Sequence, residues 1–333
     1  MYEHWSDTVS VTWDFTVGPV SFVANLVLIF IISKYTPETT KTYASIILAI
    51  TISDCCSFLG TIMTSARVQP NGDQLFFVFR GLCVNYFKDD PEFRAKFCQS
   101  LYTQQLQFYI LNHFILIFSY VYRMLIITRP FDKIDNRKLV YSILLIYCPL
   151  HFCYFNWATY MALEPLEDVR REFAKVQPEI VASNATYYGI IYLTHPSQIV
   201  FNILSVASAP VTILITFLCR WRTIYFSRKF QQSEKLKKLH KALENVFSCQ
   251  TIGPLMSSLA SILYMLVLAQ AGASDGTIIL LENLIGRPIV LMHIVNPIVT
   301  VVFITPYRNA VVGWFRKPTA VVVVQVSTSG QQA

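Results

Sequence analysis

Seven long apolar segments constrain the fold of this chain more than any other feature of its sequence. A helix needs roughly 20 predominantly apolar residues to cross the hydrocarbon core of a bilayer. Segments of that kind occupy residues 14–33, 43–63, 104–127, 140–160, 198–219, 247–269 and 278–304. Their apolar residues do not alternate with polar ones, as they would in the strands of a membrane barrel. Since only 14% of the residues are charged, we predict an all-α membrane protein, a seven-transmembrane helix bundle.

The distribution of Lys and Arg predicts the orientation of the bundle. Short loops rich in these residues are retained in the cytoplasm. With the N-terminus outside, the four cytoplasmic segments hold 17 of the 27 basic residues and the three outer loops hold 8. We therefore expect an extracellular N-terminus (residues 1–13), a seven-helix membrane domain (14–304) and a cytoplasmic tail (305–333).

The long outer loop at residues 64–103 contains Cys83 and Cys98, the two cysteines of the predicted outer segments. In an oxidising compartment such a pair predicts a disulfide that ties this loop to the start of the third span; the alternative is two free thiols. The second outer loop, 161–197, has no cysteine, but Asn184 begins an Asn-Ala-Thr glycosylation sequon there. The sequon lies on the side where the predicted topology allows a glycan.

Polar residues at membrane depth suggest a network between helices. Such groups are costly inside a bilayer and point to a function by default. Asp54 lies in the middle of the second span, Asn25 in the first, and Asn296 with Pro297 in the seventh. One interpretation is a buried network around Asp54, with or without a bound cation. The other is helix packing alone.

Four residues are candidate ligand contacts: Tyr109, His113, Glu282 and Arg287. Tyr109 and His113 lie in the outer half of the third span, where a bundle cavity opens; a hydrogen-bonded core histidine is the alternative for His113. Glu282 and Arg287 are five residues apart, which is too far round the helix for an i, i+4 pair. We expect their partners on other helices or in a cavity.

Prolines in the last two spans predict places where these helices can bend. Pro254 lies in the sixth span, and Pro288 and Pro297 lie in the seventh. A proline inside a helix frees a carbonyl and favours a kink. Hinging of the two helices is one consequence, although prolines also occur in bundles that do not move.

The predicted inner face carries the largest concentration of positive charge. Arg123 lies at the inner end of the third span, where it either contacts a partner or reaches the lipid head groups. A predicted helix from Ser233 presents Lys235, Lys237, Lys238 and Lys241. These lysines form a docking surface for a cytoplasmic partner or serve only as a retention signal for the loop.

Several short motifs together resemble a known family. They are Ser-Tyr-Val-Tyr-Arg at 119–123, Gln250-Thr251 followed by Pro254, and Asn-Pro-Ile-Val-Thr at 296–300 leading to Phe-Ile-Thr-Pro-Tyr-Arg at 303–308. In this order and position they resemble the nematode serpentine chemoreceptors, in particular class d of the Str superfamily, which are seven-helix receptors similar to G-protein-coupled receptors. The resemblance extends from the first span to Arg308.

The resemblance implies an odorant or pheromone-type receptor in the plasma membrane of sensory-neuron cilia. It also implies a small-molecule ligand, a heterotrimeric G protein as partner, and no cofactor. Arg123 matches the arginine of the receptor motif at the foot of the third span. Tyr122 precedes it where an acid is usual, so this arginine is not clamped by a neighbouring carboxylate.

Two other classes of function are weaker interpretations of the sequence. An enzyme would need a catalytic motif, and the sequence has no H-E-x-x-H, G-x-S-x-G or Gly-rich phosphate loop. A transporter would more often show repeated halves with matching broken helices. A ligand-gated channel of inverted topology would place the N-terminus inside, which the distribution of basic residues argues against.

Overall fold

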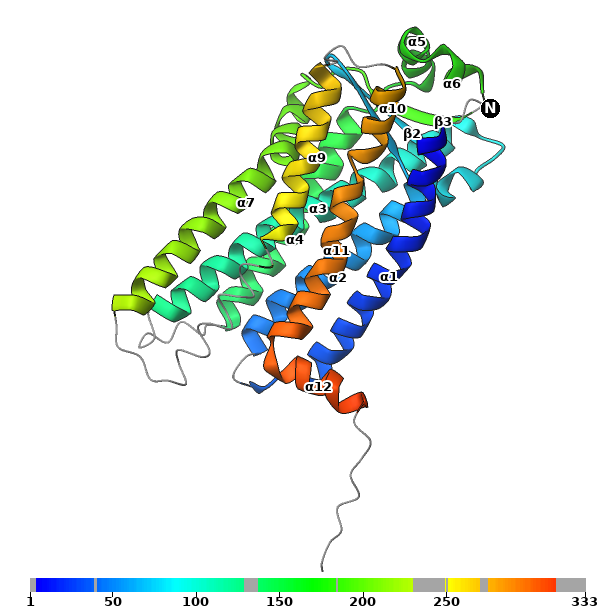
Figure 1. Ribbon diagram of the computed structural model, residues 1–333. Coiled ribbons are helices and arrows are strands. Elements are labelled where there is room, and N and C mark those ends of the chain that lie inside the picture. The colour runs from blue at the N-terminus through cyan, green and yellow to red at the C-terminus, as the bar shows by residue number, and fades with distance from the viewer. Residues whose placement is uncertain are drawn as a thin grey trace, which may run out of the picture.

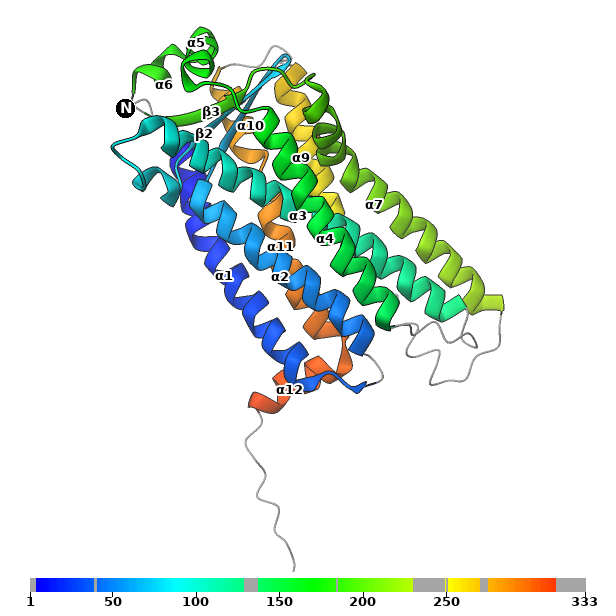
Figure 2. The same cartoon turned by 180° about the vertical axis from the view of Figure 1, so that it is seen from behind.

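The computed structural model describes residues 4–38, 41–128, 137–183, 185–229, 249, 251–269 and 275–315. Long helices run side by side in an elongated bundle (Figures 1 and 2). They are α1 (Trp5–Tyr35), α2 (Lys41–Thr64), α3 (Pro91–Thr128), α4 (Arg137–Met161), α7 (Pro196–Lys229), α9 (Ile252–Ala269), α10 (Asp275–Leu284) and α11 (Arg287–Phe303). The helix α3 packs against α2, α4 and α7 and holds the bundle together.

The predicted spans coincide with these helices. Within the described residues, six segments are long and apolar enough to cross a membrane, in α1, α2, α3, α7, α9 and the α10–α11 pair. The remaining predicted span, 140–160, lies in α4, where Pro149, His151 and Asn156 lower the apolar character. The seventh span is divided between α10 and α11, which begins just before Pro288.

The first helix begins at Trp5, nine residues before the predicted start of the span at residue 14. His4 caps it. The His4 ring nitrogen accepts from the Ser6 amide at 3.4 Å, and the Asp7 carboxylate accepts from the His4 amide at 3.1 Å. The reciprocal cap satisfies backbone donors that the helix start would leave unpaired. Polar residues of the predicted N-terminal segment therefore lie on a helix.

Of the three predicted helix breaks, the one at Pro297 is absent. The helix α11 continues through Pro297 as far as Phe303, so the lost hydrogen bond does not end it. Pro254 lies in the first turn of α9, which begins at Ile252 after the turn residue Thr251, whereas Cys249 is again helical. The predicted sixth span is therefore interrupted just before this proline. The break near Pro288 is present, between α10 and α11.

The predicted outer loops contain a sheet, so the expectation of an all-α protein holds for the bundle alone. Strands β1 (Arg67–Asn71), β2 (Gln74–Phe79) and β3 (Thr186–Ile190) pair antiparallel in the order β1-β2-β3. Asn71 pairs with Gln74 across a tight turn, in which Gly72 has a φ of 62° that glycine adopts without strain. The pairing of β2 with β3 joins the two outer loops.

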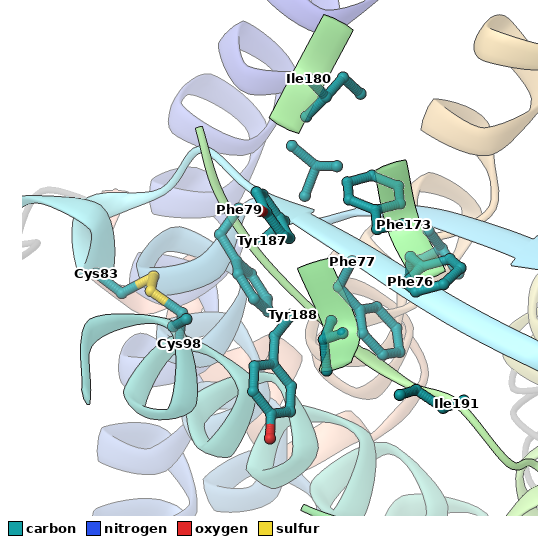
Figure 3. Packing of buried hydrophobic residues seen from close by; sticks show 14 of the residues in the cluster. Phe76, Phe77, Phe79, Cys83, Cys98, Phe173, Ile180, Tyr187, Tyr188 and Ile191 are labelled. Atoms are coloured by element: carbon teal, nitrogen blue, oxygen red, sulfur yellow. A yellow bond between two sulfur atoms is a disulfide. The ribbon is translucent and has the colours of Figure 1, made fainter. Parts of the chain in front are cut away.

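Short helices cover the sheet at one end of the bundle, which we call the sheet end (Figure 1). These are α5 (Leu166–Val176) and α6 (Pro178–Ala182), and a 3-10 turn at Leu82–Asn85 precedes α3. The rings of Phe76 and Phe173 stack with centroids 4.8 Å apart, and Phe173 contacts Tyr187 (Figure 3). This aromatic cluster seals the sheet onto the helices.

A disulfide joins Cys83 to Cys98, with Cα atoms 5.6 Å apart (Figure 3). It links the 3-10 turn to the second turn of α3, which is the pairing the sequence predicts. At the opposite end of the bundle, α12 (Thr305–Phe315) lies across the helix ends (Figure 1). The hydroxyl of Tyr307 lies 2.9 Å from that of Thr36, which anchors α12 to the end of α1.

Candidate functional site

A small pocket, the inner pocket, lies under the sheet among α3, α7, α9 and the α10–α11 junction. Its volume is about 130 Å³. Val68, Leu75 and Phe77 of the hairpin close it at the sheet end. Apolar side chains make up most of the wall, together with three tyrosines and three small polar residues. These six are Tyr102, Tyr109, Tyr264, Asn202, Ser205 and Ser261.

The polar groups of the inner pocket are held in place by the helices. Asn202 donates to the Leu193 carbonyl at 3.1 Å, and Ser205 donates to the Phe201 carbonyl at 2.8 Å. Their oxygen atoms keep lone pairs for a further donor. None of the described residues that line it is charged. The wall therefore suits a ligand that is mostly apolar and carries a hydroxyl or carbonyl group.

Tyr109 lines the inner pocket, and His113 lies one helical turn further from the sheet. The two rings meet edge to face with centroids 4.8 Å apart. His113 is completely buried, and neither ring nitrogen has a hydrogen-bond partner among the described residues. The alternative of a hydrogen-bonded core histidine therefore does not describe His113 in this structure. His113 supports the Tyr109 ring without itself lining the pocket.

Glu282 takes part in a buried ion network at the sheet end. Its Oε2 accepts from Arg67 Nε at 2.6 Å and from Gln69 Nε2 at 3.0 Å. Arg67 Nη1 lies 3.7 Å from Asp7 Oδ1, which also accepts from Arg80 Nη1 at 2.6 Å. Two arginines thus face two carboxylates, and their formal charges cancel. Glu282 binds other parts of the chain and not the inner pocket.

Arg287 is paired in the same way, with Asp14 of α1. The two Asp14 oxygens accept from Arg287 Nη1 at 2.7 and 2.6 Å, and Arg287 also contacts the Ser10 hydroxyl. The Ser65 hydroxyl donates to Asp14 at 2.8 Å. The partners that the sequence analysis placed on other helices or in a cavity are therefore on α1 for Arg287 and on β1 for Glu282. Between Glu282 and Arg287, Ile285 and Gly286 line the inner pocket.

Asp54 is the centre of a second buried network, in the middle of the bundle. Its Oδ1 accepts from Asn112 Nδ2 at 2.7 Å and lies 2.6 Å from His293 Nδ1, and its Oδ2 accepts from Asn296 Nδ2 at 3.2 Å. Asn25 donates to the His293 carbonyl at 2.8 Å. The structure thus brings Asn25, Asp54 and Asn296 together, next to Pro297, and adds two residues that the sequence analysis left out of the network.

Arg123 is buried at the end of the bundle opposite to the sheet. Its guanidinium lies over the Tyr43 ring of α2, 4.1 Å from the ring centroid. This cation–π contact joins α3 to α2. Lys235, Lys237, Lys238 and Lys241 lie outside the described residues, as does Asn184 with its sequon.

Sequence reasoning missed the hairpin and, with it, Arg67. The signal was present, because Gly72-Asp73 is a two-residue turn sequence with glycine first, and the apolar run Leu75–Phe79 follows it closely. Asp7 and Asp14 were missed for a different reason. Aspartates near the start of a chain look like solvated residues until the helix that carries them packs against α10 and α11.

In the described part of the chain, six segments long and apolar enough to cross a membrane pack with α4 into one bundle with a pocket at the sheet end. This is the architecture of a seven-transmembrane receptor. The family model described as "Serpentine type 7TM GPCR chemoreceptor Srd" matches residues 10–313. The chain therefore belongs to this family of serpentine chemoreceptors, which are receptors and not enzymes.

Three curated relatives of the same class come from Caenorhabditis elegans. Serpentine receptor class delta-3 is 25% identical over 90% of this chain and 86% of its own length. Serpentine receptor class delta-1 is 24% identical over 86% of this chain and 76% of its own length. Serpentine receptor class delta-2 is 24% identical over 86% of this chain and 78% of its own length. These matches support the class d resemblance of the motifs.

Proposed function

We propose that this chain is a chemosensory receptor that binds a small uncharged molecule in the inner pocket and signals to a heterotrimeric G protein. The observation that carries the proposal is the inner pocket itself, at one end of a seven-helix bundle of a chemoreceptor family. Tyr109 contacts the ligand, and His113 holds the Tyr109 ring. Glu282 and Arg287 position the α10–α11 junction, which forms one wall.

The size and charge of the inner pocket define the ligand class. A volume of about 130 Å³ is below the roughly 300–1,000 Å³ of sites for drug-sized ligands, so the ligand has few heavy atoms. The nearby ions neutralise one another, and the lining has no charged side chain to compensate an ionised ligand. A short alcohol, ketone or ester fits this environment.

We propose that the sheet end and the N-terminus face the outside and that the C-terminus is cytoplasmic. The excess of Lys and Arg in the opposite segments supports this orientation, as do the disulfide and the Asn184 sequon in the sheet-end loops. The receptor then lies in the plasma membrane, in the cilia of a sensory neuron if it serves olfaction.

In this orientation Arg123 and the basic segment with Lys235, Lys237, Lys238 and Lys241 lie on the G-protein side. The ligand shifts an existing equilibrium toward a state that accepts the G protein. Release of Arg123 from the Tyr43 ring is a local change that can accompany this shift, because the contact joins α3 to α2 near the proposed G-protein side.

The ligand class can be tested in cells that express the full chain with a promiscuous Gα subunit and a second-messenger reporter. The panel comprises 1-pentanol, 2-pentanone, pentanoate and pentylamine, which have similar size and different charge. We expect responses to the uncharged compounds only. Ala260→Phe places a ring in the inner pocket and abolishes the response. Leu259→Phe, on the exposed face of the same helix, leaves it unchanged and serves as the matched control.

Responses to pentanoate or pentylamine would contradict the proposed ligand class. A response that survives in Ala260→Phe would contradict the proposed site. Coupling is tested separately with Arg123→Gln and with deletion of residues 233–245. If both basal and ligand-dependent signalling persist in these variants, Arg123 and the segment 233–245 do not form the G-protein face.

Topology is tested by labelling an N-terminal tag on intact cells and by treating the receptor with an endoglycosidase. We expect surface labelling and a mobility shift that Asn184→Gln removes. A tag that is labelled only after permeabilisation would favour the channel of inverted topology.

A further inference from the structure

A second cavity, the side cavity, lies at the sheet end, outside the inner pocket. Its volume is about 500 Å³. One wall comes from the first turns of α1, with Thr8, Val11 and Thr12, and another from β2, with Val78 and Phe79. Arg94 at the start of α3, Ile180 of α6 and Thr186 of β3 also line it. It is large enough for a small organic molecule.

The side cavity has an excess of positive charge. Among the described residues, the charged ones that line it are Asp7, Arg80 and Arg94. Arg80 and Asp7 form an ion pair at 2.6 Å. Asp7 and Arg80 also belong to the four-membered ion network whose charges cancel. Among the described lining residues, the positive charge of Arg94 is therefore the one without an opposite charge to pair with.

Arg94 is half-buried and has no side-chain partner within the described part of the chain. Its Nε is buried without a hydrogen bond. The neighbouring acids are used elsewhere, because Asp90 accepts from the Phe93 amide at 2.9 Å and Glu92 pairs with Lys96 at 2.6 Å. Leaving this buried Nε–H of the guanidinium unpaired costs free energy that a bound anion would recover.

We propose that the side cavity binds a small amphipathic carboxylate, with Arg94 as its anchor. A guanidinium presents parallel N–H groups that match the two oxygens of a carboxylate. Arg80 lines the same cavity and adds to the positive potential. Thr8 and Thr12 supply hydroxyl donors, while Val11, Val78 and Phe79 offer an apolar surface for a short alkyl chain. This site is distinct from the inner pocket, which has no charged residue in its wall.

The side cavity lies outside the predicted membrane interior. Arg94 lies ten residues before the predicted start of the third span at residue 104, which is about 15 Å along a helix. The same carboxylate chemistry is available from a free fatty acid or from the serine head group of a lipid. The test below separates these two sources.

The experiment measures binding of octanoate to the purified full chain in nanodiscs of zwitterionic lipid, by titration calorimetry at pH 7 with empty nanodiscs as the blank. We expect saturable binding of octanoate and none of 1-octanol, which has the same chain without the charge. Arg94→Gln should weaken octanoate binding at least tenfold. Lys96→Gln, two residues further along α3 and not among the residues that line the side cavity, should bind as the unchanged chain does.

Equal binding of octanoate to the unchanged chain and to Arg94→Gln overturns the proposal, and so does saturable binding of 1-octanol with the same affinity. Thr12→Phe fills the side cavity from its exposed rim and leaves Arg94 in place, so it decides the question if Arg94→Gln does not fold. We expect it to weaken binding, and normal binding would contradict the site.

Repeating the titration in nanodiscs with phosphatidylserine identifies the source of the carboxylate. Unchanged octanoate binding assigns the side cavity to a free acid. If phosphatidylserine weakens the binding of octanoate to the unchanged chain and does not weaken its residual binding to Arg94→Gln, the side cavity is assigned to the lipid head group. The responses of the receptor to uncharged ligands in cells are a separate readout, so failure of either proposal leaves the other testable.

Discussion

The sheet end and the middle of the bundle both bury polar side chains, but they balance them differently. At the sheet end, Arg67 and Arg80 face Asp7 and Glu282, and Arg287 faces Asp14, so each charge has an opposite charge beside it. In the middle, Asp54 is surrounded by two asparagines and one histidine. The first region holds its members by charge pairing and the second by hydrogen bonds to a single acid.

The difference indicates separate roles. Removing one member of a balanced ion network leaves an uncompensated buried charge, so the sheet end resists change. The Asp54 network can alter its hydrogen bonds without creating a new charge, because its other members are amides and an imidazole. It connects α2, α3 and α11. We infer that the sheet end is the fixed part of the receptor and that rearrangement occurs in the middle and beyond.

The largest effect is expected from breaking the sheet-end network. Arg67→Met leaves Glu282 buried without its cation and should lower the free energy of unfolding by about 3–5 kcal/mol. Thermal melting of the purified protein in detergent measures this. The double variant Arg67→Met/Glu282→Met should recover much of the loss. Arg171→Met, which removes an exposed pair with Asp168, is the control and should change little. If Arg67→Met lowers the free energy of unfolding only slightly, the proposed difference between the sheet end and the middle of the bundle is wrong.

Loss of the disulfide tests the covalent part of the sheet end. Cys83→Ser/Cys98→Ser frees a loop closed over a sequence separation of 15 and should cost about 2–4 kcal/mol. Hydrogen exchange should increase in β1, β2 and the start of α3, and much less around Asp54. The control is Cys153→Ser, because Cys153 is an exposed free cysteine. An increase in exchange spread evenly along the bundle would contradict a local role.

A smaller loss of stability is expected in the middle of the bundle. Asp54→Asn keeps the shape of the side chain but weakens three hydrogen bonds that involve a carboxylate, at a cost of about 1–3 kcal/mol. We expect a larger change in basal signalling than the Arg67 variant shows at equal surface expression. Melting and reporter assays on the same preparations measure both quantities. If Asp54→Asn destabilises the protein as strongly as Arg67→Met, the two networks do not differ in kind.

The smallest effect concerns Tyr188 in the sheet. Burial raises the pKa of the Tyr188 phenol to about 12, and its hydroxyl donates to the Glu164 carbonyl. The unfolded chain ionises near pH 10, so stability from the neutral phenol is complete below pH 10 and is lost as pH rises toward about 12. Tyr188→Phe should cost about 1 kcal/mol at pH 7 and flatten this alkaline loss. Melting curves from pH 8 to 12 compare the two proteins.

Much of the fold can be predicted because membrane insertion is decided locally. A run of apolar residues such as 14–33 forms a helix whatever its neighbours are, since the backbone must satisfy its own hydrogen bonds in lipid. Asp54 and Asn296 can also be singled out from the sequence, because their position in the predicted spans places polar side chains deep in the membrane. The break before Pro288 could be predicted, whereas the continuity of α11 through Pro297 could not, because surrounding contacts decide whether a proline ends a helix.

The candidate site was only partly predictable. Tyr109 was placed at the pocket from its position in the outer half of its span. The partners of Glu282 and Arg287 could not be predicted from the sequence, because they lie more than 200 residues away along the chain. Arg67 and Glu282 are separated by 215 residues and meet only once the hairpin folds over the bundle.

The amino-acid sequence by itself determined the number of spans, their helical form, the family and the pairing of Cys83 with Cys98 in one loop. These follow from local apolar content, short motifs and compartment chemistry. Only the tertiary structure decided that Glu282 and Arg287 are neutralised by α1 and the hairpin while Arg94 is left facing a cavity. Charge balance depends on distances between side chains from different helices, and those distances exist only after the bundle and its sheet have packed.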